Sequence, residues 1–444
     1  MIITPLLKHQ QKALDTIKGS CGIYMPFGSG KSLVALSVIE SLGARRILIT
    51  SDRNNIINTW GDQISRHTDY EFIVRPDNPL TFIQKNKDSV VCICINYDLL
   101  CRRVKEYLKV DWDLWIGDES SEVKDQRTAK HKGTRVITSN IRKRLILNGR
   151  IMTERLEDIY GQVVLLDEGK SLGRTLSHFR GRYMEEDSQG YGFIPRRSAF
   201  TRVRRDMAKV SYFMTPEEEA SLKMPERIYN VVTVNMTPEQ KRIDDELKLH
   251  FQAVMSEKVI DTKYAAVTYI KRIQVMGGIF RPTEETQEPE RIPTEKLDVV
   301  KNIIQSNKKD KIIIWHTYIP ETDLLKDYLT EQGIEYVVVD SPKCSDVLEK
   351  YRTNKFPKVA LVRTSLCKGL NQLVGARIGV FYSNPLSYSR RAQAEGRTCR
   401  ITSTSNDTHY FDIVCRNGTD QVVHHMLSQK KGLTFCLTNL RNLL

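Results

Sequence analysis

The sequence predicts an α/β protein of two similar lobes, and three observations lead to that prediction. Short runs rich in Ile, Val and Leu, without polar alternation, occur towards both ends of the chain, as in strands buried on both faces of a sheet. Amphipathic helical stretches separate these runs, and this alternation is typical of a parallel sheet covered by helices. The stretch between the two regions has a different composition, and we expect a mainly helical insertion there.

Each lobe is predicted from five apolar runs. The expected strands of the first lobe are Cys21–Met25, Arg46–Thr50, Val90–Asn96, Leu114–Gly117 and Arg144–Leu147. The expected strands of the second lobe are Lys311–Trp315, Glu335–Val339, Val359–Arg363, Arg377–Tyr382 and His409–Val414. Helical patterns separate them, for example Lys31–Ser41 and Asn55–Arg66 in the first lobe and Glu321–Glu331 in the second.

The middle of the chain sets the expected domain boundaries. Residues 155–225 mix basic clusters with glycine and aromatic residues, and Thr237–Met255 reads as a long helix that begins with an N-cap threonine followed by proline. Pro282–Pro293 is rich in Glu, Thr and Pro, as in a linker. We therefore predict a first lobe over 1–160, an insertion over 161–225, connecting helices and linker over 226–293, and a second lobe over 294–444.

The charge of the chain suits a nucleic-acid partner. The 444 residues carry a formal net charge of +14, which favours a polyanion, although a merely soluble basic protein would fit the composition equally well. Nine cysteines lie without CxxC pairs, so we expect reduced thiols rather than a zinc site. The first residues are too few for a signal peptide, and no apolar run approaches the roughly 18 residues of a membrane span. We expect a monomer in a bacterial or host-cell cytoplasm, with no membrane partner.

A glycine-rich segment follows the first expected strand and opens the first expected helix, with Gly28, Ser29, Gly30, Lys31 and Ser32 in order. Glycines let backbone N–H groups close around phosphate oxygens, and the start of a helix adds positive partial charge. Lys31 would reach the β- and γ-phosphates of ATP, and the Ser32 hydroxyl would ligate Mg²⁺. Because Met25 stands where the longer GxxxxGK[ST] pattern has glycine, the match is to the shorter GxGK[ST] form, and a glycine-rich turn that binds nothing is the alternative.

Two acids at the end of the strand Leu114–Gly117 supply the second part of this chemistry. An acid at the carboxyl end of such a strand lies beside the phosphate loop in folds of this type. We expect Asp118 to hold Mg²⁺ and Glu119 to orient or deprotonate the attacking water. The alternative is an exposed acidic turn.

Several further segments stand in a fixed order along the chain. They are Leu7–Gln10, Asp118–Ser121, Leu147–Arg150, Val203–Asp206, Val234–Gln240, Ile313–Trp315, Thr364–Ser365 with Lys368–Asn371, and Gln393–Ile401. In this order they resemble the motifs of superfamily 2 helicases and translocases, and among these the Snf2-like group. The last segment is very similar to the QAxxRxxRI motif of that family.

The resemblance implies two RecA-like lobes and a composite site for ATP and Mg²⁺. In the family pattern Gln10 is placed to read adenine, and Gln393 belongs to the last motif of the nucleotide site. Arg397 and Arg400 lie three residues apart, so on a helix they share a face. Arginines of this kind stabilise the charge of the transferred phosphate, and such fingers are worth roughly 10³–10⁵ in rate.

Three positions depart from the family pattern. Ser121 ends the acidic motif, Asp118–Ser121, where many relatives carry His. In Leu147–Arg150, which sits where the family has its coupling motif, Asn148 and Arg150 stand where relatives carry Thr or Ser and Thr. The residues needed for hydrolysis are all present, so these departures bear on how tightly ATP turnover is coupled to the grip on nucleic acid.

Contacts to the nucleic-acid backbone should come from hydroxyls, amides and basic side chains near strand ends. The candidates are Ser51, Arg53, Asn96, Thr364 and Lys368, with Arg204 and Arg205 in the basic segment. The stretch Phe179–Arg205 is either a DNA-contacting insertion or wedge, or a helical cap on the first lobe.

Three functions remain open at this point. The first is a DNA helicase that unwinds or remodels forked or branched DNA in replication, recombination or repair. The second is a translocase that moves on duplex DNA without separating its strands. The third is a nucleic-acid-binding ATPase that works as a slow switch. We expect DNA as the partner in preference to RNA.

Overall fold

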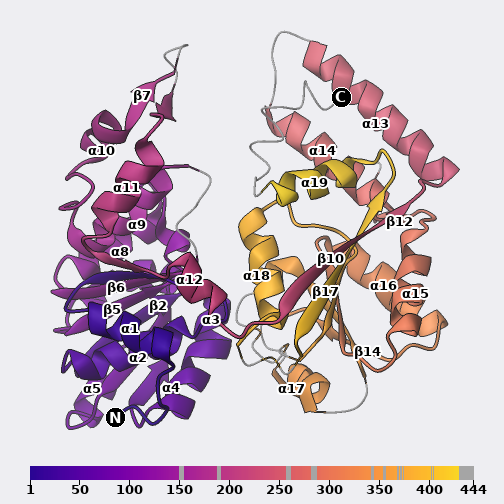
Figure 1. The fold of residues 1–444 in the computed structure, drawn as a ribbon. Coiled ribbons are helices and arrows are strands. Elements are labelled where there is room, and N and C mark those ends of the chain that lie inside the picture. Colours follow the sequence, from indigo (N-terminus) through magenta and orange to yellow (C-terminus); the bar gives the residue numbers. More distant parts are fainter. Residues whose placement is uncertain are drawn as a thin grey trace. The chain divides into compact units, whose positions relative to one another are not determined.

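The chain forms two compact units, Met1–Lys223 and Met224–Leu444, in the computed structural model (Figure 1). The structure describes residues 1–149, 155–187, 192–256, 262–281, 288–341, 345–353, 357–367, 370, 373, 375–401, 403 and 405–429. The second unit begins just before the strand β10 (Glu226–Val234). The division into four segments at 160, 225 and 293 stays a prediction.

The first unit holds a parallel sheet of seven strands in the order β3-β4-β2-β5-β6-β1-β9. The strands are β1 (Cys21–Tyr24), β2 (Arg46–Ser51), β3 (Glu71–Val74), β4 (Val91–Asn96), β5 (Leu114–Asp118), β6 (Lys143–Asn148) and β9 (Ser211–Phe213). All five expected strands are present. The sequence did not predict β3 and β9, because both are short edge strands without a long apolar run.

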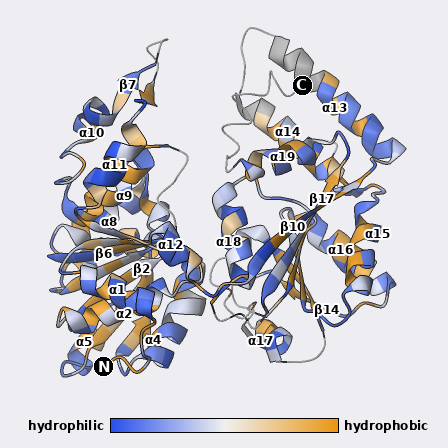
Figure 2. Cartoon of the chain, viewed as in Figure 1, coloured by the Kyte–Doolittle hydropathy of each residue, from blue (hydrophilic) through white to orange (hydrophobic). Residues whose placement is uncertain are grey.

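Helices cover both faces of this sheet, and alternate strand residues enter two separate cores. Leu48 and Trp115 belong to one core, whereas Ile49 and Cys94 belong to the other. Figure 2 shows the hydrophobic residues along the strands. The helices are α1 (Lys8–Thr16), α2 (Lys31–Ser41), α3 (Arg53–Asn55), α4 (Gly61–His67), α5 (Pro79–Lys85), α6 (Tyr97–Arg102), α7 (Val104–Tyr107), α8 (Ala129–Thr138), α9 (Glu157–Asp167), α10 (Leu176–Tyr183), α11 (Ala199–Met207) and α12 (Pro216–Ala220).

The insertion belongs to the first unit and is mainly helical, as expected. Phe179 and Tyr183 of α10 and Val203 of α11 are buried in the same core as the sheet. A small antiparallel hairpin interrupts the helices, formed by β7 (Met184–Glu186) and β8 (Phe193–Pro195).

The second unit holds a parallel sheet of six strands in the order β10-β17-β16-β13-β15-β14. With β10, these strands are β13 (Ile312–His316), β14 (Tyr336–Val339), β15 (Val359–Arg363), β16 (Ile378–Phe381) and β17 (Asp407–Cys415). All five expected strands are present. The sequence did not predict β10, because this edge strand mixes polar with apolar residues and keeps several of them exposed.

The second sheet is also covered by helices, so the expected fold of two parallel sheets with helical layers is confirmed. These helices are α13 (Pro238–Ser256), α14 (Thr262–Met276), α15 (Lys296–Ser306), α16 (Ile319–Glu331), α17 (Ser345–Thr353), α18 (Tyr388–Thr398) and α19 (Thr419–Ser428). The predicted linker Pro282–Pro293 lies partly outside the described residues, and within it β12 (Glu290–Arg291) pairs with β11 (Ile279–Phe280). In the described part of the chain, no helix combines the length and the apolar character of a membrane span.

Candidate nucleotide site

The glycine-rich loop leads from β1 to the start of α2. Gly28 and Gly30 have φ values of 80° and 86°, in the left-handed region that favours glycine. A Cβ atom on Gly30 would lie 2.1 Å from Nε2 of Gln10, so the close packing of α1 also requires glycine there. The loop thereby presents the N-terminal end of α2, where backbone N–H groups and the helix dipole favour an anion.

The side chains of the loop are held by its own backbone. Nζ of Lys31 donates to the carbonyl oxygens of Met25 and Pro26, at 3.0 Å each, and lies 5.2 Å from the centre of the Phe27 ring. The hydroxyl of the buried Ser29 donates to the Pro26 carbonyl at 2.8 Å. Ser32 is half-buried in the first turn of α2. Met25, which stands where the longer pattern has glycine, is fully buried in the core.

Helix α1 supports the loop from outside. The buried Gln10 donates through Nε2 to the carbonyl of Ser29 at 3.2 Å, and its Oε1 accepts from the backbone N–H of Leu7 at 2.9 Å. A ring nitrogen of His9 lies 2.9 Å from the same Ser29 carbonyl. Gln10 thus contacts the loop directly, and its recognition of adenine stays a prediction.

Asp118 ends β5 and is fixed by three donors. Its Oδ2 accepts from the Ser51 hydroxyl and from Nε1 of Trp60, both at 3.0 Å, and its Oδ1 accepts from the backbone N–H of Glu119 at 2.9 Å. Burial raises the pKa of Asp118, and the hydrogen bond from Trp60 and the charge of Lys31 oppose that rise. Because β5 and β1 flank β6 in the parallel sheet, Asp118 lies at the same carboxyl edge as the glycine-rich loop.

These residues fit a magnesium ion. Mg²⁺ takes oxygen ligands and is usually bound by one or two carboxylates together with substrate phosphates and water. Oδ1 of Asp118 accepts the hydrogen bond from Glu119 and retains a further lone pair for an ion. Ser32 and Asp118 would therefore hold the ion, as the sequence predicts.

Glu119 is held in a strained conformation. Its φ of 47° lies in the left-handed region, and the side chain is only 7% exposed. A non-glycine residue in such a region costs about 1–3 kcal/mol and is typical of functional sites. The turn at Glu119 starts the short 3-10 helix Ser120–Val123 and directs the chain away from β5.

A buried polar cluster joins the acidic motif to the coupling motif. The Ser120 hydroxyl donates to Oε1 of Gln162 at 2.7 Å, and Nδ2 of Asn148 donates to the same oxygen at 3.1 Å. Nε2 of Gln162 donates in turn to the Asp158 carbonyl at 2.9 Å. Gln162 lies on α9 outside any motif, so the sequence did not reveal it. Asn148 is therefore part of a bridge that a threonine would be too short to form in the same way.

The structure divides the predicted nucleic-acid contacts into two groups. Arg53, Arg204 and Arg205 are exposed. Ser51, Asn96 and Thr364 are buried, and the hydroxyls of Ser51 and Thr364 contact Asp118 and Thr317 respectively. Lys368 lies outside the described residues, as does Arg150 of the coupling motif.

In the second unit, Arg397 lies in the last turn of α18, whereas Arg400 follows the helix, which ends at Thr398. The expectation that the two arginines share a helix face was therefore wrong, because Cys399 is extended and breaks the helix between them. Arg397 is buried, and Arg400 donates through Nε to the Gly396 carbonyl at 2.9 Å. Burial and the nearby charge of Arg397 lower the pKa of Arg400 to about 9. Two adjacent cations raise the local positive potential, which favours an anionic ligand. Gln393 is buried on the same helix.

The sequence did not predict the residue that positions α18. Arg391 is buried and forms an ion pair with Asp412 of β17. Its Nε also donates to Oε1 of Glu395 at 2.7 Å, and its guanidinium lies 3.4 Å from the centre of the Phe381 ring. These contacts attach α18 to the strands β17 and β16 of the second sheet.

Comparison with known proteins agrees with the motif resemblance. No protein-family model matches the chain. The chain is 21% identical over 437 residues to "Putative protein p41" of Acyrthosiphon pisum secondary endosymbiont phage 1, covering 93% of this chain and 92% of that one. It is 21% identical over 348 residues to an "Uncharacterized ATP-dependent helicase" of Mycoplasma pneumoniae, covering 77% of this chain and 32% of the relative.

Two further similarities extend over nearly the whole chain. The chain is 20% identical over 451 residues to "ISWI chromatin-remodeling complex ATPase ISW1" of Saccharomyces cerevisiae, covering 96% of this chain and 39% of the relative. The solved "Sulfolobus solfataricus SWI2/SNF2 ATPase core in complex with dsDNA" is 17% identical with a TM-score of 0.46, covering 97% and 92% of the two chains. The chain thus spans well under half of the helicase and of the yeast ATPase.

Proposed function

We propose that this chain, as a Snf2-like member of helicase superfamily 2 and hence an ATP hydrolase by class, couples ATP hydrolysis to movement along DNA. The observation that supports this best is that the glycine-rich loop after β1 and Asp118 at the end of β5 lie at the same carboxyl edge of one parallel sheet, on either side of β6. A glycine-rich turn that binds nothing would not need a carboxylate oriented by Ser51 and Trp60 at the same edge of the sheet.

The residues of this site divide the work of hydrolysis. The N–H groups of the loop and the Lys31 ammonium would bind the phosphates of ATP. Ser32 and Asp118 would hold Mg²⁺, which neutralises charge on the β- and γ-phosphates when bound. Glu119 would orient the attacking water. Arg397 and Arg400 keep the role predicted from their motif, the stabilisation of the transferred phosphate.

Several features of the first lobe support DNA as the partner. Arg53, Arg204 and Arg205 expose basic side chains. On the insertion, Phe193 and Phe200 are 39% and 50% exposed, and Arg180 stacks 4.5 Å from the centre of the Phe193 ring. Exposed aromatic rings beside arginines suit unstacked bases and phosphates. We therefore favour forked or branched DNA as substrate, and a role in replication, recombination or repair, for a monomer.

A Snf2-like translocase that does not separate strands is the second candidate, favoured by the similarity to the yeast remodelling ATPase. The third candidate is an ATPase switch, and the altered residue Asn148 in the coupling motif favours it.

One set of assays separates the three. ATPase activity is measured with single-stranded, duplex, forked and four-way DNA and with RNA, beside strand displacement on forks and displacement of a triplex strand. Unwinding of forks supports the first function, and triplex displacement alone supports the second. Stimulated ATPase activity with neither displacement supports the switch, whereas no ATPase activity on any nucleic acid contradicts all three.

A further inference from the structure

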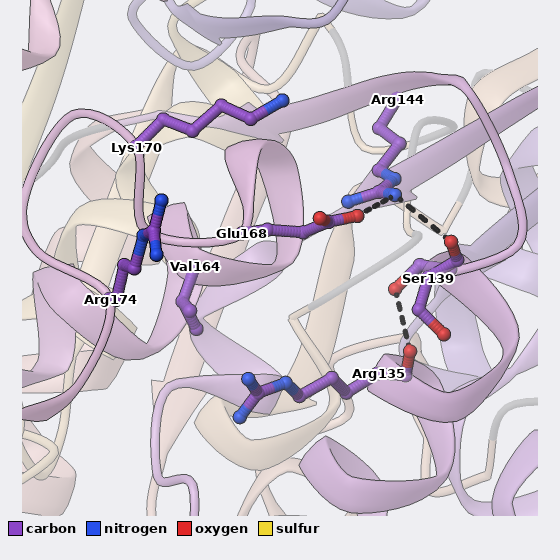
Figure 3. Close-up of a pocket in the computed structure, with 8 residues that line it drawn as sticks. Arg135, Ser139, Arg144, Val164, Glu168, Lys170 and Arg174 are labelled. Carbon is purple, nitrogen blue, oxygen red and sulfur yellow. Dashed lines mark hydrogen bonds and ion pairs between the residues drawn. The ribbon is translucent and has the colours of Figure 1, made fainter.

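A basic cavity lies at the opposite end of β6 from the coupling motif. Its volume is about 500 Å³. The lining comes from the end of α8, the start of β6, the end of α9 and the segment after α9, with Arg135, Thr138, Ser139, Arg144, Val164, Glu168, Lys170 and Arg174 (Figure 3). Arg144 and Asn148 stand four residues apart on β6, which corresponds to about 13 Å along a strand. The cavity is therefore separate from the glycine-rich loop.

The charges around the cavity are unbalanced. Four lining residues are basic, and Glu168 is the one acid among them. Nη2 of Arg144 donates to Oε1 of Glu168 at 2.6 Å, and this bond holds the pKa of Glu168 below its usual value. In the described parts of the chain, no carboxylate lies within ion-pair distance of Arg135, Lys170 or Arg174. Three cations therefore line the cavity without a matched acid.

These three cations do not serve as caps for the C-terminal ends of α8 and α9. Basic side chains often stabilise the exposed carbonyls at a helix C-terminus. Here Arg144 caps both helices. Its guanidinium donates to the carbonyls of Ser139 and Ile141 near the end of α8. It also donates to the carbonyl of Leu165 near the end of α9. Arg144 is itself buried and fixed, with Glu168 as its remaining partner.

The backbone at Glu168 shows that the wall of the cavity is held in a defined shape. Glu168 follows α9 with φ 59°, a left-handed position at which glycine is the usual residue. Gly169 has φ 81°, and its Cβ would lie 2.3 Å from the Gly173 carbonyl. The tight turn between these glycines places Lys170 and Arg174 on the same side of the cavity, as Figure 3 shows.

We propose that this cavity is a phosphate-binding site, for the phosphodiester backbone of nucleic acid or for free polyphosphate. The three cations Arg135, Lys170 and Arg174 around one cavity match a group with several negative oxygens. The volume exceeds that of a single phosphate, so the ligand is a chain of phosphates or a phosphate with its sugar. The nucleic-acid form of this site rests on the proposed function.

The test uses the full chain and the double variant Lys170→Ala/Arg174→Ala. Both side chains are exposed, so the fold should be retained, and circular dichroism checks this. Binding of labelled duplex and forked DNA is measured across salt concentrations. Each lost phosphate contact lowers the salt slope by roughly 0.9, so we expect a slope reduced by about one to two and a weaker affinity at fixed salt.

The control is the double variant Lys105→Ala/Lys109→Ala, which removes two exposed lysines of the same lobe away from the cavity. It should keep the parent salt slope. The ATPase kcat at saturating DNA should be unchanged in both double variants, because neither touches the glycine-rich loop.

A second arm separates the two phosphate sources. Tripolyphosphate is added to the parent and to the cavity variant, and the shift of the melting temperature is compared. A shift lost in the variant, with DNA binding unchanged, assigns the cavity to free polyphosphate. A variant that matches the parent in both arms overturns the proposal. If the parent shows no DNA-stimulated ATPase, the proposed function fails, while this arm still decides on the cavity.

Discussion

The two sheets use the start of a helix in opposite ways. In the first lobe, α2 begins after two left-handed glycines and carries no side-chain cap, so its N-terminal end is left for a ligand. In the second lobe, α16 begins beside its own carboxylate. Glu321 is fully buried, and its Oε2 accepts from the N–H groups of Thr317 and Tyr318, at 3.0 Å each, and from Ser383.

This contrast teaches that a parallel strand followed by a helix does not by itself make a phosphate site. The dipole of a helix attracts negative charge in both lobes. In the second lobe the carboxylate of Glu321 already accepts the N–H groups before α16, and burial raises the pKa of this carboxylate. In the first lobe the start of α2 follows Gly28 and Gly30 and carries no side-chain cap, as the predicted phosphate site requires.

The largest expected effect comes from Lys31→Ala, which removes the basic side chain of the first site and leaves the start of α2 in place. DNA-stimulated ATPase activity should fall below detection while DNA binding is spared, because the Lys31 ammonium is predicted to contact the γ-phosphate. Steady-state ATPase and fluorescence anisotropy measure the two. Lys18→Ala, an exposed lysine on the same lobe, is the matched control, and turnover retained by Lys31→Ala would refute the loop assignment.

The next effect concerns the second lobe, where arginines rather than glycines carry the predicted chemistry. Arg397→Ala should slow hydrolysis by roughly 10³-fold or more and leave nucleotide affinity nearly unchanged. Single-turnover hydrolysis and titration with a fluorescent nucleotide measure these separately. An equal loss in both would show that Arg397 is structural.

Glu321→Ala tests the stabilising side of the comparison. The variant leaves two backbone N–H groups and the Ser383 hydroxyl without their acceptor, so the free energy of unfolding should fall by about 2–5 kcal/mol. Calorimetry should show the loss in the transition of the second lobe, with nucleotide binding at saturation unchanged in the surviving protein. An unaltered melting profile would mean that water replaces the carboxylate at no cost.

The smallest effect is expected from Gln162→Leu, which removes the bridge between Ser120 and Asn148. Basal ATPase activity should be retained, while the stimulation by DNA should fall several-fold because the acidic and coupling motifs lose their shared acceptor. Gln162→Glu keeps that acceptor oxygen and should restore part of the stimulation. Equal losses of basal and stimulated activity in Gln162→Leu would indicate a general packing defect.

Sequence predicted the central strands and the two motifs of the first site because both depend on local pattern. Leu114–Asp118 is apolar until its final acid, and the glycines at 28 and 30 mark their own backbone conformation. The edge strands β3, β9 and β10 escaped prediction because an edge strand needs no continuous apolar run. Contacts between residues far apart in the sequence were not predicted either. No local pattern indicates that Gln162 contacts Ser120 or that Arg391 contacts Asp412.

One contact of the first site also provides an optical signal. The indole of Trp60 is fully buried, and its N–H group donates to the carboxylate of Asp118. Indole emission depends on the charge and hydrogen bonding around the ring nitrogen. A cation that binds to the Asp118 carboxylate should therefore change the fluorescence of Trp60. The chain has four tryptophans, and replacing the other three by phenylalanine would leave an intrinsic reporter of metal and nucleotide occupancy that needs no attached dye.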